Sequence, residues 1–250
     1  MQAYWTLVRR ELSGYFFSMT GYVIIAAAMF LLGFSFVNLL KQLQHQPTPM
    51  PLSELFYGTW YFWLILLLTT PVITMRLFAL ERFSGTFETL MTTPVSDLQV
   101  VLAKFSAALV FYVLMWLPLL VYMFLVRLYT HEPGAFDSGL AGSTLAGIIL
   151  LGGLFLSLGC CASALTRSQV TAAMISLVSS AAIFLLSLLA DQVAVQPDWQ
   201  SKVLASFALF DQMHNCARGV LDSRMLVFCA TATLFFLFLT LRIVESRRWK

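Results

Sequence analysis

Charged residues are scarce in this chain of 250 residues. They make up 11% of the sequence, whereas 60% of it is hydrophobic, and the net charge is only +3. A chain with so little charge does not form an ordinary soluble fold, so its composition predicts an integral membrane protein with a single polytopic domain, residues 1–250. Because no run of basic residues is present, we expect no nucleic-acid partner.

Motifs for catalysis are also missing. The sequence contains no phosphate-binding G-x-x-x-x-G-K-[ST] loop, no H-E-x-x-H zinc motif and no G-x-S-x-G nucleophile turn, and its four cysteines lack the spacing of a metal site or disulfide framework. Acidic residues and histidines are absent near the middle of the apolar stretches, where an intramembrane enzyme or an ion-coupled carrier needs them. We therefore expect no catalytic residue, metal or cofactor in this chain, and an intramembrane enzyme is disfavoured.

Long apolar stretches are what the sequence does contain. A helix that spans the membrane needs about 20 mostly apolar residues. Six stretches qualify and predict an all-α protein with spans at about 20–40, 56–78, 98–127, 139–165, 169–190 and 225–245. Six spans place both termini on one side, and the larger share of Lys and Arg there, Lys104 among them, predicts that this side is cytoplasmic.

Two amphipathic segments accompany the spans. Residues 1–18 place aromatic and aliphatic side chains on one helical face and Arg9 and Arg10 on the other, which predicts an interfacial helix on the cytoplasmic leaflet. A second helix is predicted at about 81–93, between spans two and three, and Pro94 ends it. Its apolar stripe comprises Leu80, Phe83, Phe87, Leu90 and Met91, and its polar side comprises Glu81, Arg82, Thr86, Glu88 and Thr89. So many charges cannot cross the bilayer, so this helix lies at the surface or against a partner protein.

The fourth stretch is rich in small residues, several of them four positions apart, including Gly142, Gly147, Gly152 and Gly159. Small residues let helices approach closely in lipid. Packing within the chain is the favoured interpretation, and a dimer face or a pathway lining is the alternative.

The external region at about 191–224 is unusually apolar. Pro197 opens a predicted helix with an apolar side, so we expect the region to dip into the membrane or to cover the bundle as a lid. Its last residues are Phe210, Asp211, Arg218, Gly219 and Asp222. For the charged ones, a mutual ion pair or a helix cap is the simplest interpretation.

Three patches resemble permeases of the ABC-2 type. They are the run from Pro71 to Leu90 with Pro94-Val95-Ser96, the segment Phe210-Asp211 with residues 217–222, and the C-terminal residues 242–249. The resemblance is closest to the gliding-motility and nitrous-oxide-reductase-maturation permeases. It implies six spans, an N-terminal elbow helix, a coupling helix between spans two and three, and re-entrant external helices before the last span.

The same resemblance implies partners and a location. The chain would form a homodimer or heterodimer with a second permease chain in the bacterial cytoplasmic (inner) membrane, in contact with membrane lipid. Two copies of an ATP-binding cassette subunit would bind ATP and Mg and drive export.

Two sets of site residues follow from this resemblance. Coupling to the ATPase is assigned to Glu81, Arg82, Ser84, Gly85, Thr86, Glu88 and Leu90; the alternative is a surface helix that contacts only lipid headgroups and water. The candidates for lining a pathway are Thr69, Thr70, Thr74, Ser176, Ser179 and Ser180; the alternative is that these hydroxyls bond to their own helix backbone.

A second function remains open. The apolar external region also fits a mechanotransmission or assembly device, in which ATP-driven motion acts on a periplasmic partner and no solute crosses the membrane.

Overall fold

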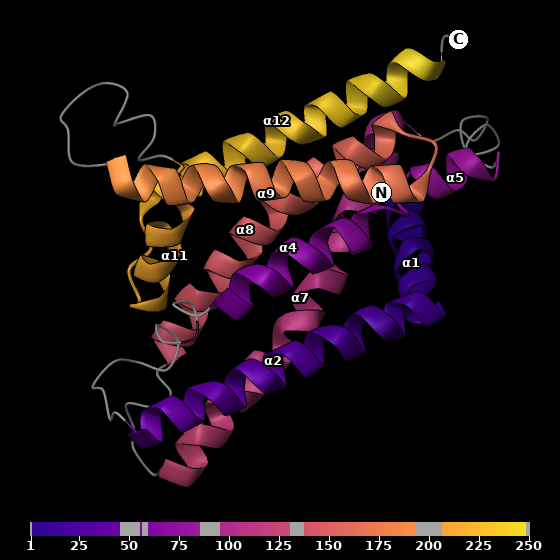
Figure 1. The fold of residues 1–250 in the computed structure, drawn as a ribbon. Coiled ribbons are helices and arrows are strands. Elements are labelled where there is room, and N and C mark those ends of the chain that lie inside the picture. The colour runs from indigo at the N-terminus through magenta and orange to yellow at the C-terminus, as the bar shows by residue number, and fades with distance from the viewer. Residues whose placement is uncertain are drawn as a thin grey trace.

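The computed structural model describes residues 2–45, 56, 60–85, 96–130, 138–193 and 207–248. Within these ranges every regular element is a helix (Figure 1). The elements are α1 (Gln2–Phe16), α2 (Met19–His45), α4 (Trp60–Thr74), α5 (Ala79–Phe83), α7 (Asp97–Thr130), α8 (Ser138–Leu165), α9 (Gln169–Val193), α11 (Leu209–Ala217) and α12 (Ser223–Arg248). The predicted all-α class is confirmed.

Within the described ranges, six segments are long and apolar enough to cross a membrane, as predicted. They are Met19–Lys41, Trp60–Phe83, Asp97–Leu128, Gly139–Leu165, Gln169–Ala190 and Ser223–Ser246. The second segment differs most from its predicted range of about 56–78. Helix α4 ends at Thr74, and a turn at 75–78 leads into α5, so the observed segment extends to Phe83. Helix α5 is therefore continuous with the second span, and it packs against α8 and α9.

Helix α8 lies at the centre of the bundle. In its most apolar window 72% of the residues are buried, compared with 28% for α2 and α9 and 22% for α12. Its glycines let neighbouring helices approach, because a β-carbon at Gly152 would overlap the ring of Tyr112 on α7 and one at Gly159 would overlap Thr74 on α4. The small residues of this span thus serve packing within the chain, which was the favoured of the two interpretations.

Helix α1 runs across the long helices and meets α2 at a sharp corner (Figure 1). It packs on α7, where Val8 contacts a small cluster with Ala103 and Ala107. Tyr4 donates a hydrogen bond to Ser106 Oγ at 2.9 Å, and Tyr15 donates one to the carbonyl oxygen of Ile73 at 2.9 Å. The N-terminal helix is therefore attached to both α7 and α4.

The two short helices lie at opposite ends of α8. Helix α5 contacts its C-terminal end, around Ser163, whereas α11 contacts its N-terminal part, where Ser143 donates a hydrogen bond of 2.8 Å to the carbonyl oxygen of Cys216. The same long helix thus touches the segment predicted to couple to an ATPase and the segment predicted to form an external lid.

Candidate functional site

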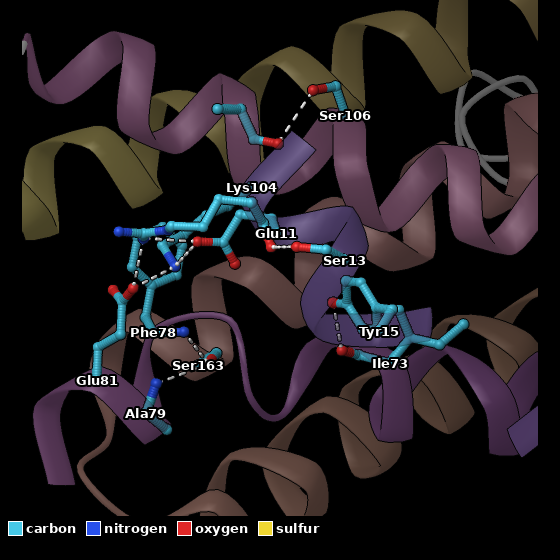
Figure 2. A network of polar contacts seen from close by, with 12 residues as sticks. Glu11, Ser13, Tyr15, Ile73, Phe78, Ala79, Glu81, Lys104, Ser106 and Ser163 are labelled. Atoms are coloured by element: carbon cyan, nitrogen blue, oxygen red, sulfur yellow. Dashed lines mark hydrogen bonds and ion pairs between the residues drawn. The ribbon is translucent and has the colours of Figure 1, made fainter. Parts of the chain in front are cut away.

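Four charged side chains form an ion cluster where α1, α5 and α7 meet (Figure 2). The Nζ atom of Lys104 on α7 lies 3.0 Å from Oε1 of Glu11 on α1 and 2.9 Å from Oε1 of Glu81 on α5. Arg10 of α1 contacts the same two carboxylates, at 2.9 Å from Glu11 and 3.2 Å from Glu81. Each cation contacts both carboxylates, so the ion cluster joins three segments that are distant in the sequence.

Lys104 is the most buried member of the ion cluster. Its side chain is 2% exposed, against 16% for Glu11, 17% for Glu81 and 52% for Arg10. An ammonium group removed from water loses several kcal/mol of hydration, and only well-placed partners offset that loss. Two carboxylates and the ring of Phe78, whose centroid lies 5.5 Å from Nζ, supply these partners. The stability of Lys104 at this position therefore depends on both α1 and α5.

The ionisation of Glu11 reflects its surroundings. Burial by itself raises the pKa of Glu11, because the carboxylate loses contact with water. The charges and hydrogen bonds of Lys104 and Arg10 outweigh this effect, so the pKa of Glu11 lies below its ordinary value of 4.5. The hydrogen bond to Glu11 in turn raises the pKa of Arg10. These two residues of the ion cluster stay charged at neutral pH.

Helix α5 is also bound to the C-terminal end of α8. The Oγ atom of Ser163 accepts hydrogen bonds from the backbone N–H groups of Phe78 and Ala79, each at 3.1 Å (Figure 2). Arg82 donates from Nη1 to the carbonyl oxygens of Ala164 at 2.5 Å and Thr166 at 3.1 Å. The first N–H groups and the last carbonyls of a helix lack partners within that helix, so these bonds satisfy both elements. A cation at a helix C-terminus is also favoured by the helix dipole.

The charged residues of α5 consequently face the rest of the protein. Glu81 and Arg82 are partly buried, whereas Leu80 is 40% exposed and Phe83 is 78% exposed. The assignment of Glu81 and Arg82 to contacts with an ATPase stays a prediction, and the structure places both side chains in contacts within the chain. Helical periodicity separates a polar side from an apolar side, but it does not tell which side meets the bundle. In this protein the polar side meets the bundle, because its charged residues have polar partners on α1, α7 and α8.

Helix α5 ends early in the range predicted for the coupling helix. Its last residue is Phe83, the N–H of Ser84 bonds to the carbonyl oxygen of Leu80, and Gly85 has a φ of +73°. Glycine adopts this left-handed conformation at little cost, and it commonly ends a helix. Helix α5 thus ends before Ser84 and Gly85, and residues 86–93 of the predicted helix over 81–93 lie outside the described ranges. Three of the predicted coupling residues lie outside the described ranges: Thr86, Glu88 and Leu90.

The hydroxyl groups predicted to line a pathway lie on α4 and α9, which pack against each other. Thr69, Thr70 and Thr74 are buried and donate hydrogen bonds of 2.7, 2.8 and 2.9 Å to carbonyl oxygens of α4. Ser179 donates to the carbonyl oxygen of Ile175 on its own helix at 2.7 Å. The remaining two serines, Ser176 and Ser180, are buried, and their Oγ atoms have no hydrogen-bond partner among the described residues. The alternative of bonding within the helix holds for the three threonines and Ser179.

The predicted lid residues lie in and after α11. Phe210 stacks on Trp63 of α4 with ring centroids 5.9 Å apart, and its backbone N–H donates to Ser187 Oγ at 3.2 Å. Asp222 accepts a hydrogen bond of 3.0 Å from the N–H of Arg224 and so caps α12, which is one of the two interpretations left open. The other three lid residues, Asp211, Arg218 and Gly219, are exposed, and Gly219 has a φ of +89°. Residues 194–206 of the external region lie outside the described ranges.

The sequence did not indicate the contacts of Glu11, Lys104 and Ser163. From the sequence, Lys104 counts only as one of the basic residues that predict the cytoplasmic side. Ser163 is one small residue among many on its span. One signal was available, because an ionisable residue within an apolar stretch needs a partner, and the two amphipathic segments supply three acidic residues, Glu11, Glu81 and Glu88.

The charged side chains of the described site contact one another. Across the described ranges, no group of three or more His, Cys, Asp and Glu side chains lies close enough to hold a metal ion. Both carboxylates of the ion cluster are occupied by cations. What the arrangement supplies is a mechanical link, since any displacement of α5 changes the contacts of α1, α7 and α8.

Comparison with known proteins identifies the family. No curated protein matches the chain significantly. A family model described as ABC-2 family transporter protein matches residues 17–183, which is more than half of the chain. The match includes α2 to α8 and most of α9, and with them Glu81, Lys104 and Ser163. The chain therefore belongs to the ABC-2 family of transporter proteins and is a multi-pass membrane permease of the ABC transporter class.

Proposed function

We propose that this chain is the permease subunit of an exporter driven by a separate ATP-binding cassette subunit. On this proposal two cassette subunits, which bind ATP and Mg, act on two permease chains, identical or different, in a bacterial cytoplasmic membrane, with both termini of this chain cytoplasmic. Family membership supports the permease role. The observation that carries the coupling role is the ion cluster, which ties α5 to α1 and α7.

The contacts of α5 divide into two groups with different proposed roles. Glu81 and Arg82 hold this short helix to α1, α7 and α8, so a displacement of α5 is passed on to these helices as a rigid-body movement. Leu80 and Phe83 of the same helix are exposed, and Phe83 is the more exposed of the two. Exposed aromatic residues are frequent anchors of protein interfaces, so we assign docking of the ATPase to Phe83 and coupling to Glu81.

Docking can be tested with Phe83→Ser. Burial of a phenylalanine side chain is worth about 1.5–3 kcal/mol, so we expect this variant to bind the ATP-binding subunit roughly tenfold to a hundredfold more weakly in co-purification from membranes. Val220→Ser is the matched control, because Val220 is 60% exposed and follows α11 at the opposite end of α8. Unchanged binding in Phe83→Ser would remove α5 from the interface.

Coupling can be tested separately with Glu81→Gln. Because Glu81 faces Arg10 and Lys104, we expect the variant to retain the ATP-binding subunit but to lose most of the stimulation of ATP hydrolysis by the permease. Glu245→Gln removes a carboxylate from a surface ion pair of α12 and serves as the control. If Glu81→Gln instead releases the ATPase, Glu81 contacts the partner directly and the division of roles is incorrect.

A second candidate function is a mechanotransmission or assembly device, favoured by one observation. Helix α8 contacts α5 at one end and α11 at the other, so movement of α5 has a direct route to the opposite end of the bundle. Vesicles that contain only the permease and its ATPase distinguish the two functions. ATP-dependent accumulation of a solute in them supports export and contradicts the mechanical alternative.

A further inference from the structure

A cavity of about 110 Å³ lies at the corner between α1 and α2. It is lined by Glu11, Gly14 and Tyr15 of α1, by Thr20 of α2 and by Arg76, among others. Its volume exceeds the roughly 10–15 Å³ of accessible space that one water molecule requires, so it has room for a larger polar group.

Arg76 in this cavity has no negatively charged partner among the residues that the structure describes. Its Nη1 atom donates hydrogen bonds to the hydroxyl oxygens of Ser18, at 3.2 Å, and Thr20. Its Nε atom is buried and has no hydrogen-bond partner, and no carboxylate within the described part of the chain lies at ion-pair distance from Arg76. Cations removed from water are normally paired, so this guanidinium has donor capacity that the described residues do not use.

The acidic residue that lines the cavity does not supply this charge. Oε1 of Glu11 accepts from Arg10 and Lys104, and the two cations and two carboxylates of the ion cluster balance each other. Within the described ranges, no carboxylate therefore compensates the positive charge of Arg76 in the cavity. The chemistry that completes it is an anion with several acceptor oxygens.

The surface around the corner indicates where that anion comes from. Phe17 is 88% exposed, Met19 is 87% exposed and Tyr22 is 62% exposed, all at the α1–α2 corner that Figure 1 shows. In a membrane protein such side chains lie in lipid, and aromatic residues gather at the level of the headgroups. A cation next to exposed apolar side chains matches a molecule with an anionic head and an apolar tail.

We propose that this cavity binds the phosphate group of a membrane phospholipid. Arg76 is the cationic partner, since a guanidinium presents several N–H donors in a plane that fits phosphate oxygens. The hydroxyl groups of Ser18 and Thr20 hold the guanidinium in place, and the acyl chains lie along Phe17 and Met19. This site does not depend on the proposed transport function.

The test measures binding of defined probes to the delipidated, full-length chain in detergent by native mass spectrometry. The probes are dioleoylphosphatidylglycerol, dioleoylglycerol, which has the same chains and no phosphate, and inorganic phosphate. We expect the phospholipid to bind best, and its Kd to rise about tenfold or more in Arg76→Gln, which removes charge-assisted hydrogen bonds. Arg242→Gln is the control, because it removes the same charge from the exposed face of α12.

Two outcomes would overturn the proposal. An equal loss of binding in Arg76→Gln and Arg242→Gln means that anionic lipid is attracted by general charge and no built site exists. Binding of inorganic phosphate that depends on Arg76, with no gain from the acyl chains, assigns the cavity to the free anion.

A second variant keeps the test decisive if Arg76→Gln does not fold. Gly14 lines the same cavity, and a β-carbon there would contact nothing within 4 Å, so Gly14→Leu narrows the cavity and leaves Arg76 in place. We expect it to weaken phospholipid binding to a similar degree. Wild-type affinity in this variant would place the lipid elsewhere.

Discussion

Lys104 of α7 and Glu81 of α5 form an ion pair of 2.9 Å in which the lysine side chain is only 2% exposed. Through this ion pair, the carboxylate of Glu81 on α5 contacts the interior of the protein and not only the solvent. The same lysine also contacts Glu11 of α1, so one buried cation holds the helix before the first span and the segment after the second. The short helix assigned to coupling is therefore part of the bundle rather than an independent surface helix.

Replacement of Lys104 tests how much this ion pair stabilises the protein. Lys104→Met removes the most buried cation from Glu11 and Glu81. We expect the free energy of unfolding to fall by about 3 kcal/mol, the lower end of the range for breaking a buried pair, because the carboxylates are partly exposed. Thermal unfolding in detergent measures the change. Lys104→Arg retains the charge and should recover much of the loss; equal losses in both variants would point to packing rather than charge.

The pKa of Glu11 predicts a dependence of stability on pH. It lies below the ordinary value of 4.5 in the folded protein, so the unfolded chain binds more protons as the pH falls. The stabilisation is complete above the unfolded pKa and is lost as the pH drops through the folded pKa. We expect melting temperatures measured from about pH 7 down to pH 3 to fall less steeply in Glu11→Gln than in wild type. Glu245→Gln, which changes a surface pair, should retain the wild-type slope.

Two adjacent glycines of α8 provide a matched test of helix packing. A β-carbon at Gly152 would overlap the ring of Tyr112, whereas the nearest atom to a β-carbon at Gly153 is Thr233 Oγ1, at 3.8 Å. We expect Gly152→Ala to lower the free energy of unfolding by about 1–3 kcal/mol. Gly153→Ala should be neutral or slightly stabilising, because alanine favours the helix. Similar melting temperatures for the two variants would contradict the close approach of α7 and α8.

Ser163 is predicted to hold α5 in place. Ser163→Ala removes the oxygen that accepts hydrogen bonds from the N–H groups of Phe78 and Ala79. Each buried donor left without a partner lowers the free energy of unfolding by about 1–3 kcal/mol. We expect faster hydrogen exchange at residues 76–85. Ser157→Ala is the control, since Ser157 is also buried but bonds only to the carbonyl oxygen of Leu154 on its own helix. Unchanged exchange in Ser163→Ala would show that the ion cluster and Arg82 hold α5 without Ser163.

The arrangement of spans could be predicted from the sequence because it depends on local properties. Hydropathy over about 20 residues locates a span regardless of what it packs against, and the six predicted stretches match the six observed ones. The glycines of α8 indicated close packing for the same reason, since the absence of a side chain is visible in the sequence itself.

The orientation of α5 could not be predicted because it depends on distant partners. Glu81 meets Lys104 and Arg10, and Arg82 meets the end of α8, and none of these contacts is evident from the periodicity of residues 81–93. An amphipathic helix considered alone is expected to expose its charges to water. Buried partners of opposite charge reverse this preference, and only the tertiary structure reveals them.

Close contact through Gly152 and Gly159 has a consequence for how the molecule changes shape. With Tyr112 and Thr74 seated against the backbone of α8, the helices α4, α7 and α8 have no space to slide along one another. They form a rigid unit. In any large rearrangement, we expect α2 to move relative to this unit, because α2 is less buried. A change in the tilt of α2 leaves the contacts of Tyr112 and Thr74 with the glycines of α8 intact.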